Sequence, residues 1–202
     1  MYTLYDFLPS GNGYKVRLIL NRLNLQYKYI EKDILAGETR TKEFLQLNSN
    51  GRIPLLQLEN GECLAESNAI LMYLAEDTPF LPSDKLEKAR VLQWLFFEQY
   101  SHEPNIAVVR FWMTHGGPTE EQKTQLDVKM AAGYAALSVM ETQLQQSDFL
   151  VGDTCSVADI ALYAYTHVAH EGGFDLSSFP ALTNWLSQMQ NQPGHTLITD
   201  IK

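Results

Sequence analysis

The sequence predicts two domains of different class: an α/β domain with a mixed sheet, followed by a domain made of helices alone. Over residues 1–80, short strand patterns alternate with helical patterns, which is typical of an open α/β sheet. A segment with two prolines follows, and beyond it strand patterns give way to long apolar helical stripes. We therefore expect a first domain over residues 1–78, a linker over 79–84 and a helical domain over 85–202.

The elements of the first domain follow from short apolar or aromatic runs for strands and from apolar residues spaced i, i+3, i+4 for helices. Their order is strand, helix, strand, helix, strand, strand, helix. Asn60-Gly61 between the last two strands is typical of a hairpin, because both residues tolerate positive φ, and this hairpin makes the sheet mixed. Strands are expected at residues 2–5, 27–30, 55–58 and 62–65, and helices from near 13, at 41–47 and at 67–76.

The second domain begins with a long apolar helix over residues 86–113, in which Pro104 should produce a kink or a break. Ser156 and Asp159 form a predicted capping box at the start of a later helix that is apolar on most sides. Further helical stripes are expected over residues 126–144, 157–168 and 182–189.

Charge limits the class of partner. The formal net charge of −9 repels a polyanion, so we expect no nucleic-acid partner. Residues 1–80 are nearly balanced, with 8 basic and 10 acidic side chains, whereas the remainder has 7 and 14. An anionic ligand is therefore more easily held by the first domain.

The two cysteines exclude other chemistry. Cys63 and Cys155 are far apart and no C-x-x-C is present, so we expect no disulfide framework and no protein dithiol mechanism. The chain contains no metal-ligand spacing, and we expect no metal. It shows neither a signal-peptide pattern nor a long apolar run, so we expect a cytoplasmic protein without a membrane span.

Ser10 and Asn12 lie between the first strand and the first helix, where unpaired backbone N–H groups and partial positive charge stabilise an anion, including a thiolate. Their side chains can donate hydrogen bonds to such a group. Ordinary capping is the alternative, because serine and asparagine are preferred N-cap residues, and spacing alone favours it.

Two further motifs are ambiguous when taken singly. Arg52-Ile53-Pro54 places a proline directly before a strand; a cis bond there would expose the Ile53 backbone to a peptide-like ligand, although most X-Pro bonds are trans. Glu66 and Ser67 begin a helix, where Ser67 is either an N-cap or a ligand for a carboxylate, with Glu66 pairing to an ammonium group.

Together and in this order, these signals resemble the cytosolic glutathione S-transferase superfamily over essentially the whole chain, most specifically in Arg52-Ile53-Pro54 and in residues 64–70. The resemblance implies a thioredoxin-like first domain with glutathione as co-substrate, and a helical domain that forms the acceptor-substrate site. It implies that Pro54 is cis and that the Ile53 backbone pairs with the cysteinyl unit. Arg52 would then neutralise the glycyl carboxylate.

The resemblance also assigns the two ends of the ligand. Glu66 and Ser67 would hold the γ-glutamyl end. Ser10 and Asn12 would approach the thiol, as a hydroxyl and an asparagine do in the bacterial nu-like group, in which threonine stands where this chain has Ser10.

Three functions follow as hypotheses. The first is a homodimeric transferase that activates the glutathione thiol for attack on small electrophiles. The second is a glutathione-dependent disulfide-bond reductase. The third is a binding or regulatory module that keeps the fold without catalysis. The physiological acceptor and the preference for reduced or oxidised glutathione do not follow from the sequence.

Overall fold

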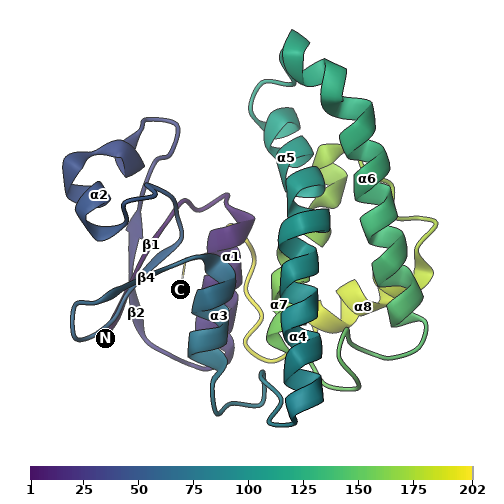
Figure 1. Ribbon diagram of the computed structural model, residues 1–202, viewed down its shortest axis with the longest axis horizontal. Helices are drawn as coiled ribbons and strands as arrows, with labels where there is room; N and C mark the ends of the chain where they lie inside the picture. The colour runs from purple at the N-terminus through teal and green to yellow at the C-terminus, as the bar shows by residue number, and fades with distance from the viewer. Residues whose placement is uncertain (202) are drawn as a thin grey trace. The chain divides into compact units, whose positions relative to one another are not determined.

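The computed structural model describes residues 1–201, which form two compact units (Figure 1). The first unit comprises Met1–Glu76 together with the C-terminal segment from Pro193 onward, and the second comprises Asp77–Gln192. The sequence pattern predicts that the whole C-terminal segment belongs to the helical domain. The structure instead packs it on the first unit, because Tyr14 and Arg17 donate hydrogen bonds to its backbone carbonyls.

The first unit contains a four-stranded mixed sheet, as predicted. The strand order is β2-β1-β3-β4; β1 runs parallel to β2, and β3 is antiparallel to both β1 and β4. The strands are β1 (Tyr2–Asp6), β2 (Tyr27–Glu31), β3 (Leu55–Gln57) and β4 (Cys63–Ala65).

Helices lie on both faces of this sheet (Figure 1). α1 and α3 lie side by side on one face, and α2 lies on the other, where the ring of Phe44 meets the ring of Tyr5 edge to face. The bounds are α1 (Gly11–Arg22), η1 (Glu38–Arg40), α2 (Lys42–Leu47) and α3 (Ser67–Ala75). This confirms the thioredoxin-like arrangement.

α1 is more deeply buried than its apolar stripe predicts. The 3.6-residue pattern places Lys15 and Arg17 away from the buried stripe, yet both side chains are completely buried. Neighbouring α3 and the C-terminal segment hold them, through Ser67 and through the carbonyl of Ile198.

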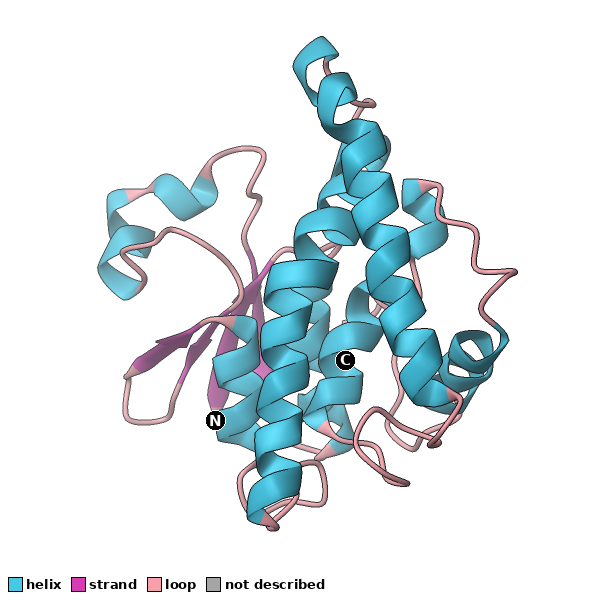
Figure 2. Cartoon of the chain, turned by 45° about the vertical axis from the view of Figure 1, so that its right-hand side comes forward, coloured by secondary structure: helices cyan, strands magenta, loops and turns pink. Residues whose placement is uncertain are grey.

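The second unit consists of helices (Figure 2). They are α4 (Lys85–Phe97), η2 (Glu98–His102), α5 (Glu103–Thr114), α6 (Glu120–Leu144), α7 (Val157–Thr166), η3 (Ala169–Gly172) and α8 (Pro180–Gln190). None of the helices within residues 1–201 combines the length and apolar character needed to cross a membrane.

The break predicted at Pro104 takes the form of a π-helical turn. Residues of η2 continue α4 directly into α5, and Pro104 occupies the first turn of α5. Proline has no N–H and its ring displaces the carbonyl four residues earlier, so a wider turn before it keeps the helix continuous.

The predicted capping box at α7 is confirmed. The Asp159 carboxylate accepts hydrogen bonds from four donors: the Ser156 N–H and hydroxyl at 2.9 Å each, the Leu150 N–H at 2.9 Å and the Trp185 indole at 3.0 Å. Burial raises the pKa of Asp159, and the hydrogen bonds oppose this effect. The Asp159 carboxylate therefore links the start of α7 to α8, in which Trp185 lies.

Candidate functional site

The strand register brings three separate segments to one end of the sheet. In the β3–β4 ladder Leu55 pairs with Ala65, so the next step of this ladder places Pro54 opposite Glu66. In the β1–β3 ladder Tyr5 pairs with Leu55, so the loop that follows β1 begins at the same end. The sheet therefore gathers the Ser10 loop, the Ile53-Pro54 turn and the start of α3.

Ser10 is the N-cap of α1, with extended backbone angles (φ −73°, ψ 124°). Its Oγ accepts a hydrogen bond from the Gly13 N–H at 3.4 Å, so the capping interpretation is correct for this residue. Capping does not exclude a second role, because a hydroxyl that accepts one bond still has a proton to donate.

Asn12 and Ser67 join the first turns of α1 and α3. The Ser67 hydroxyl donates to Asn12 Oδ1 at 3.2 Å, and Ser67 Oγ accepts from Lys15 Nζ at 3.3 Å. Lys15 Nζ also lies 3.5 Å from Asn68 Oδ1. The two helix starts thus meet through a polar network in which Lys15 and Ser67 are buried.

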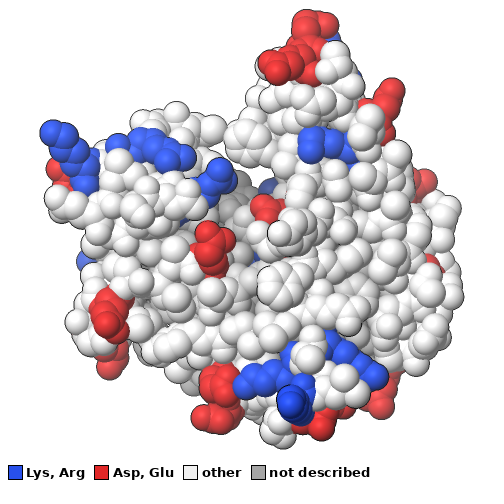
Figure 3. Space-filling view, in the orientation of Figure 1, with Lys and Arg blue, Asp and Glu red and all other residues white. Residues whose placement is uncertain are grey.

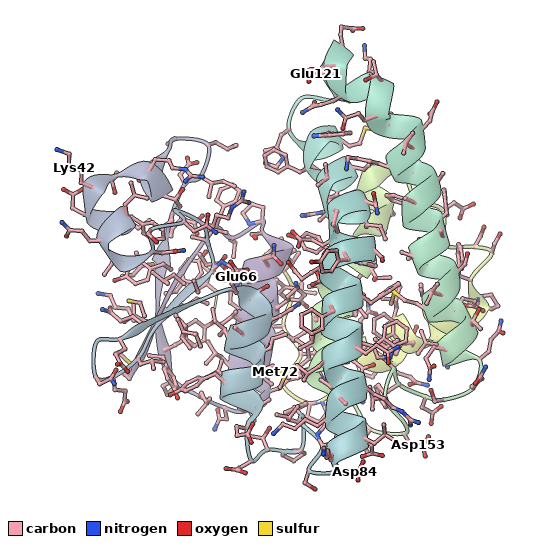
Figure 4. The ribbon with its side chains drawn as sticks, viewed as in Figure 1. Lys42, Glu66, Met72, Asp84, Glu121 and Asp153 are labelled. Carbon is pink, nitrogen blue, oxygen red and sulfur yellow. The ribbon has the colours of Figure 1, made fainter. Side chains whose placement is uncertain are left out.

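α3 begins one residue earlier than the N-cap interpretation of Ser67 requires. Glu66 is the N-cap, its side chain makes no capping bond, and Ser67 is the first residue of the helix. Glu66 is exposed at the start of α3 (Figure 4). Its φ of 68° is rare for a residue with a side chain and costs about 1–3 kcal/mol, a strain that is concentrated at functional sites.

The Ile53–Pro54 peptide bond is cis, as the family resemblance implies. Asn48 Nδ2 donates to the Arg52 carbonyl at 2.8 Å and fixes the chain ahead of this bond. The Arg52 side chain itself is exposed. Basic side chains of the first unit gather over the part that carries α2 (Figure 3).

A buried ion pair that was not predicted from the sequence supports the Ser10 loop. Arg17 Nε lies 3.0 Å from Asp6 Oδ2, and both side chains are fully buried. Arg17 also donates to the Leu8 carbonyl, in the loop before Ser10, at 2.7 Å.

Burial raises the pKa of Asp6 to about 7 and outweighs the opposing attraction of Arg17. A Cβ at Gly13 would lie 1.5 Å from Asp6 Oδ1, so only glycine fits at this position of α1.

Lys15 and Arg17 had one signal in the sequence: they are charged residues on either side of Val16, within the most apolar part of α1. Charged residues beside an apolar stripe are usually solvated, so the signal identifies them only after the neighbouring segments are placed.

The starts of α1 and α3 can attract an anion. Neither α1 nor α3 has an acidic residue in its first turn, so no carboxylate of the first turn neutralises the partial positive charge there. The N–H groups at both helix starts and the polar side chains around them can bind a carboxylate or a thiolate. Within residues 1–201 no cluster of three His, Cys, Asp or Glu side chains is arranged to hold a metal ion.

Comparison with known protein families decides the relationship. Residues 1–76 match the N-terminal domain of glutathione S-transferase, and residues 102–193 match the C-terminal domain. The chain belongs to the glutathione S-transferase family. Members of this family are therefore the reference for the site.

Three relatives illustrate the relationship. A crystal structure of glutathione S-transferase from Pseudomonas fluorescens is 52% identical, with a TM-score of 0.96 over 98% of this chain and 99% of that one. The disulfide-bond oxidoreductase YfcG of Escherichia coli is 32% identical over 96% of this chain and 92% of its own length. The glutathione transferase URE2P6 from Phanerochaete chrysosporium, solved in complex with oxidised glutathione, is 28% identical, with a TM-score of 0.84 over 96% and 92% of the two chains.

Proposed function

We propose that this protein is a glutathione-dependent transferase that activates the thiol of glutathione at the start of α1. The observation that carries the proposal is the junction of α1 and α3, where Asn12 and Ser67 share a hydrogen bond at 3.2 Å beside two helix starts without first-turn acids. URE2P6, which shares the fold and is 28% identical, holds oxidised glutathione.

The peptide-like ligand would use each part of the site. The N–H and C=O of Ile53, next to cis Pro54, pair with the cysteinyl unit. Ser67 and the start of α3 bind the γ-glutamyl carboxylate, and the exposed Glu66 pairs with the neighbouring ammonium. Arg52, also exposed, neutralises the glycyl carboxylate.

The thiol lies at Ser10 and Asn12. A free thiol has a pKa of about 8.5, so little thiolate exists at neutral pH. Donation from the Ser10 hydroxyl and the Asn12 amide, with the partial positive charge of the helix start, favours the charged form. A decrease of about two units makes thiolate dominant at pH 7 and corresponds to about 2.7 kcal/mol. The thiolate then forms a C–S bond to the electrophile as the leaving group departs with its electron pair.

Disulfide-bond reduction is the second candidate, favoured by the similarity to YfcG at 32% identity. The glutathione thiolate would attack one sulfur of a substrate disulfide, form a mixed disulfide with it and release the other sulfur as a thiolate. A second glutathione thiolate would then attack the glutathione sulfur of the mixed disulfide, which releases the remaining substrate thiolate and leaves oxidised glutathione. The protein's own cysteines fit this role poorly. Burial raises the pKa of Cys63, and Cys155 is buried against Met189.

We further propose, from family membership, that the protein is a cytoplasmic homodimer and that the helical unit supplies the acceptor-substrate site. Sedimentation analysis at micromolar concentration should give a mass near twice that of one chain, and a monomer would contradict the dimer.

The test of function is calorimetric titration with reduced and then oxidised glutathione, followed by kinetics. Tighter binding of reduced glutathione supports the transferase, and tighter binding of the oxidised form supports the reductase. Binding of neither at millimolar concentration would exclude both and leave a non-catalytic module.

Single substitutions assign the thiol end. Ser10→Ala and Asn12→Ala should each lower kcat/KM by about 10- to 100-fold, the effect of losing a donor worth 1.5–3 kcal/mol to a charged group. Ser49→Ala, at an exposed serine of the same unit, is the control. Unchanged kcat/KM in both variants would remove Ser10 and Asn12 from the mechanism.

A further inference from the structure

Lys15 is a completely buried cation that the proposed mechanism does not use. A buried ammonium is unfavourable unless hydrogen bonds replace its hydration. Its Nζ lies 3.3 Å from Ser67 Oγ and 3.5 Å from Asn68 Oδ1, two oxygens of neutral side chains in the first turn of α3. The positive charge is therefore held directly behind the hydroxyl proposed to bind the γ-glutamyl carboxylate.

The Ser67 hydroxyl has one proton and accepts through its lone pairs. It accepts from Lys15 and donates its proton to Asn12 Oδ1 at 3.2 Å. Accepting from an ammonium polarises the hydroxyl and makes it a stronger donor. A ligand carboxylate would replace Asn12 Oδ1 as the acceptor of the Ser67 hydroxyl. The residues proposed to bind the carboxylate and the thiol are therefore linked by one hydrogen bond.

We propose that Lys15 is a positioning residue that gives the site its specificity for the α-carboxylate of the γ-glutamyl unit, acting through Ser67. The inference rests on the proposed function and deepens it. The charge of Lys15 adds to that of the α1 and α3 starts, neither of which has a first-turn acid to oppose it. Lys15 is buried and contacts Ser67. Removing its charge should therefore lower the affinity only for ligands that have the α-carboxylate.

The test compares glutathione with 4-aminobutanoyl-cysteinyl-glycine, which lacks only that carboxylate, by calorimetric titration of the full chain. The variants are Lys15→Met and Lys15→Gln, which remove the charge, and Lys15→Arg, which keeps it. Lys28→Met removes the same charge from an exposed position of the first unit and is the matched control. Thermal unfolding of each variant reports whether it folds.

Wild type should bind glutathione at least about tenfold more tightly than the analogue, as expected for a charge-assisted hydrogen bond. Lys15→Met and Lys15→Gln should reduce this preference to within about threefold, with the loss confined to glutathione. Lys15→Arg should keep most of the preference, and Lys28→Met should change neither affinity.

Equal weakening of both ligands in the neutral variants would indicate a purely structural lysine and overturn the proposal, as would an unchanged preference. If Lys15→Met and Lys15→Gln do not fold, Lys15→Leu and Lys15→Ala replace them in the same titrations, since both remove the charge and leave the Ser67 hydroxyl in place. A selective loss of glutathione affinity in these variants supports the proposal, and an unchanged preference overturns it. Wild type that binds neither ligand would refute the proposed function itself, which separates that failure from the failure of the lysine's role.

Discussion

The starts of α1 and α3 in the first unit differ from the helix starts of the second unit. In the second unit an acidic side chain stands in the first turn or reaches the first N–H groups of each of the helices α4 to α8. These acids are Asp84 and Glu87 for α4, Glu103 for α5, Glu120 and Glu121 for α6, Asp159 for α7 and, reaching across from α6, Glu141 for α8. Acidic side chains are visible at the tip where α6 begins (Figure 3).

In the first unit α1 and α3 have no acid in the first turn. Their N-terminal turns contact each other through Asn12 and Ser67, with Lys15 beneath. A carboxylate at a helix start is worth about 0.3–1 kcal/mol to stability. At α1 and α3 no carboxylate lies in the first turn, and the side chain of Glu66, the N-cap of α3, makes no capping bond. The anion of the proposed ligand would gain the interaction at these two helix starts instead.

The largest expected effect is at Asp159. Asp159→Asn removes the charge that accepts four hydrogen bonds and directs an amide N–H group at donors, so we expect a loss of about 3–5 kcal/mol in unfolding free energy. Urea denaturation measures it. Asp153→Asn, at an exposed position of the preceding loop, should change stability by less than about 0.5 kcal/mol. Similar losses in both variants would contradict a special role of the α7 start.

The Asp6 carboxyl beneath α1 should make stability pH-dependent. Its folded pKa is raised to about 7, so between pH 4 and 7 the folded state keeps a proton that the unfolded state releases. The contribution to stability is fully present below about pH 4 and is lost as pH rises through 7, by up to about 4 kcal/mol. Asp6→Asn lacks this titration, so thermal melts should show wild type losing stability relative to the variant over that range. Parallel curves would contradict the raised pKa.

The two serine N-caps should differ in their worth to stability. Ser156 Oγ accepts a hydrogen bond from the Ala158 N–H and donates one to the Asp159 carboxylate. Ser10 Oγ instead accepts one long hydrogen bond of 3.4 Å from the Gly13 N–H. We expect Ser156→Ala to lower the unfolding free energy by about 1–2 kcal/mol and Ser10→Ala by about 0.5 kcal/mol. Denaturant midpoints measured on both variants test the order. The reverse order would mean that Ser10 serves the fold more than the ligand.

The smallest effect would come from giving α3 the acid that the helices of the second unit have. Ala69 is exposed in the first turn of α3. Ala69→Asp should raise stability by at most about 0.5–1 kcal/mol and weaken glutathione binding several-fold, because it competes for the same partial charge. Ala69→Asn has the same shape without the charge and should leave affinity unchanged. Equal affinities of the two variants would show that the α3 start does not attract the ligand electrostatically.

Part of this site could be predicted from the sequence. The positions of Ser10, Pro54 and Ser67 followed from strand and helix boundaries, which local spacing largely sets. The start of α3 at Ser67 was also predicted, but the N-cap is Glu66 and not Ser67, because the positive φ of Glu66 depends on the surrounding fold. Asn12 was predicted as a donor to a thiol, and its contact with Ser67 was not anticipated because the two residues are far apart in sequence.

The sequence by itself determined the order of elements, the mixed sheet and the capping box of α7, because each depends on residues close together in the chain. The tertiary structure alone decided that Lys15 and Arg17 are buried, since amphipathic spacing cannot show what packs against the polar side of a helix. It also decided that the segment from Pro193 onward joins the first unit, because two carbonyl acceptors of Arg17, those of Ile198 and Asp200, lie more than 180 positions away. Contacts over such separations depend on how the chain closes on itself, which no local pattern encodes.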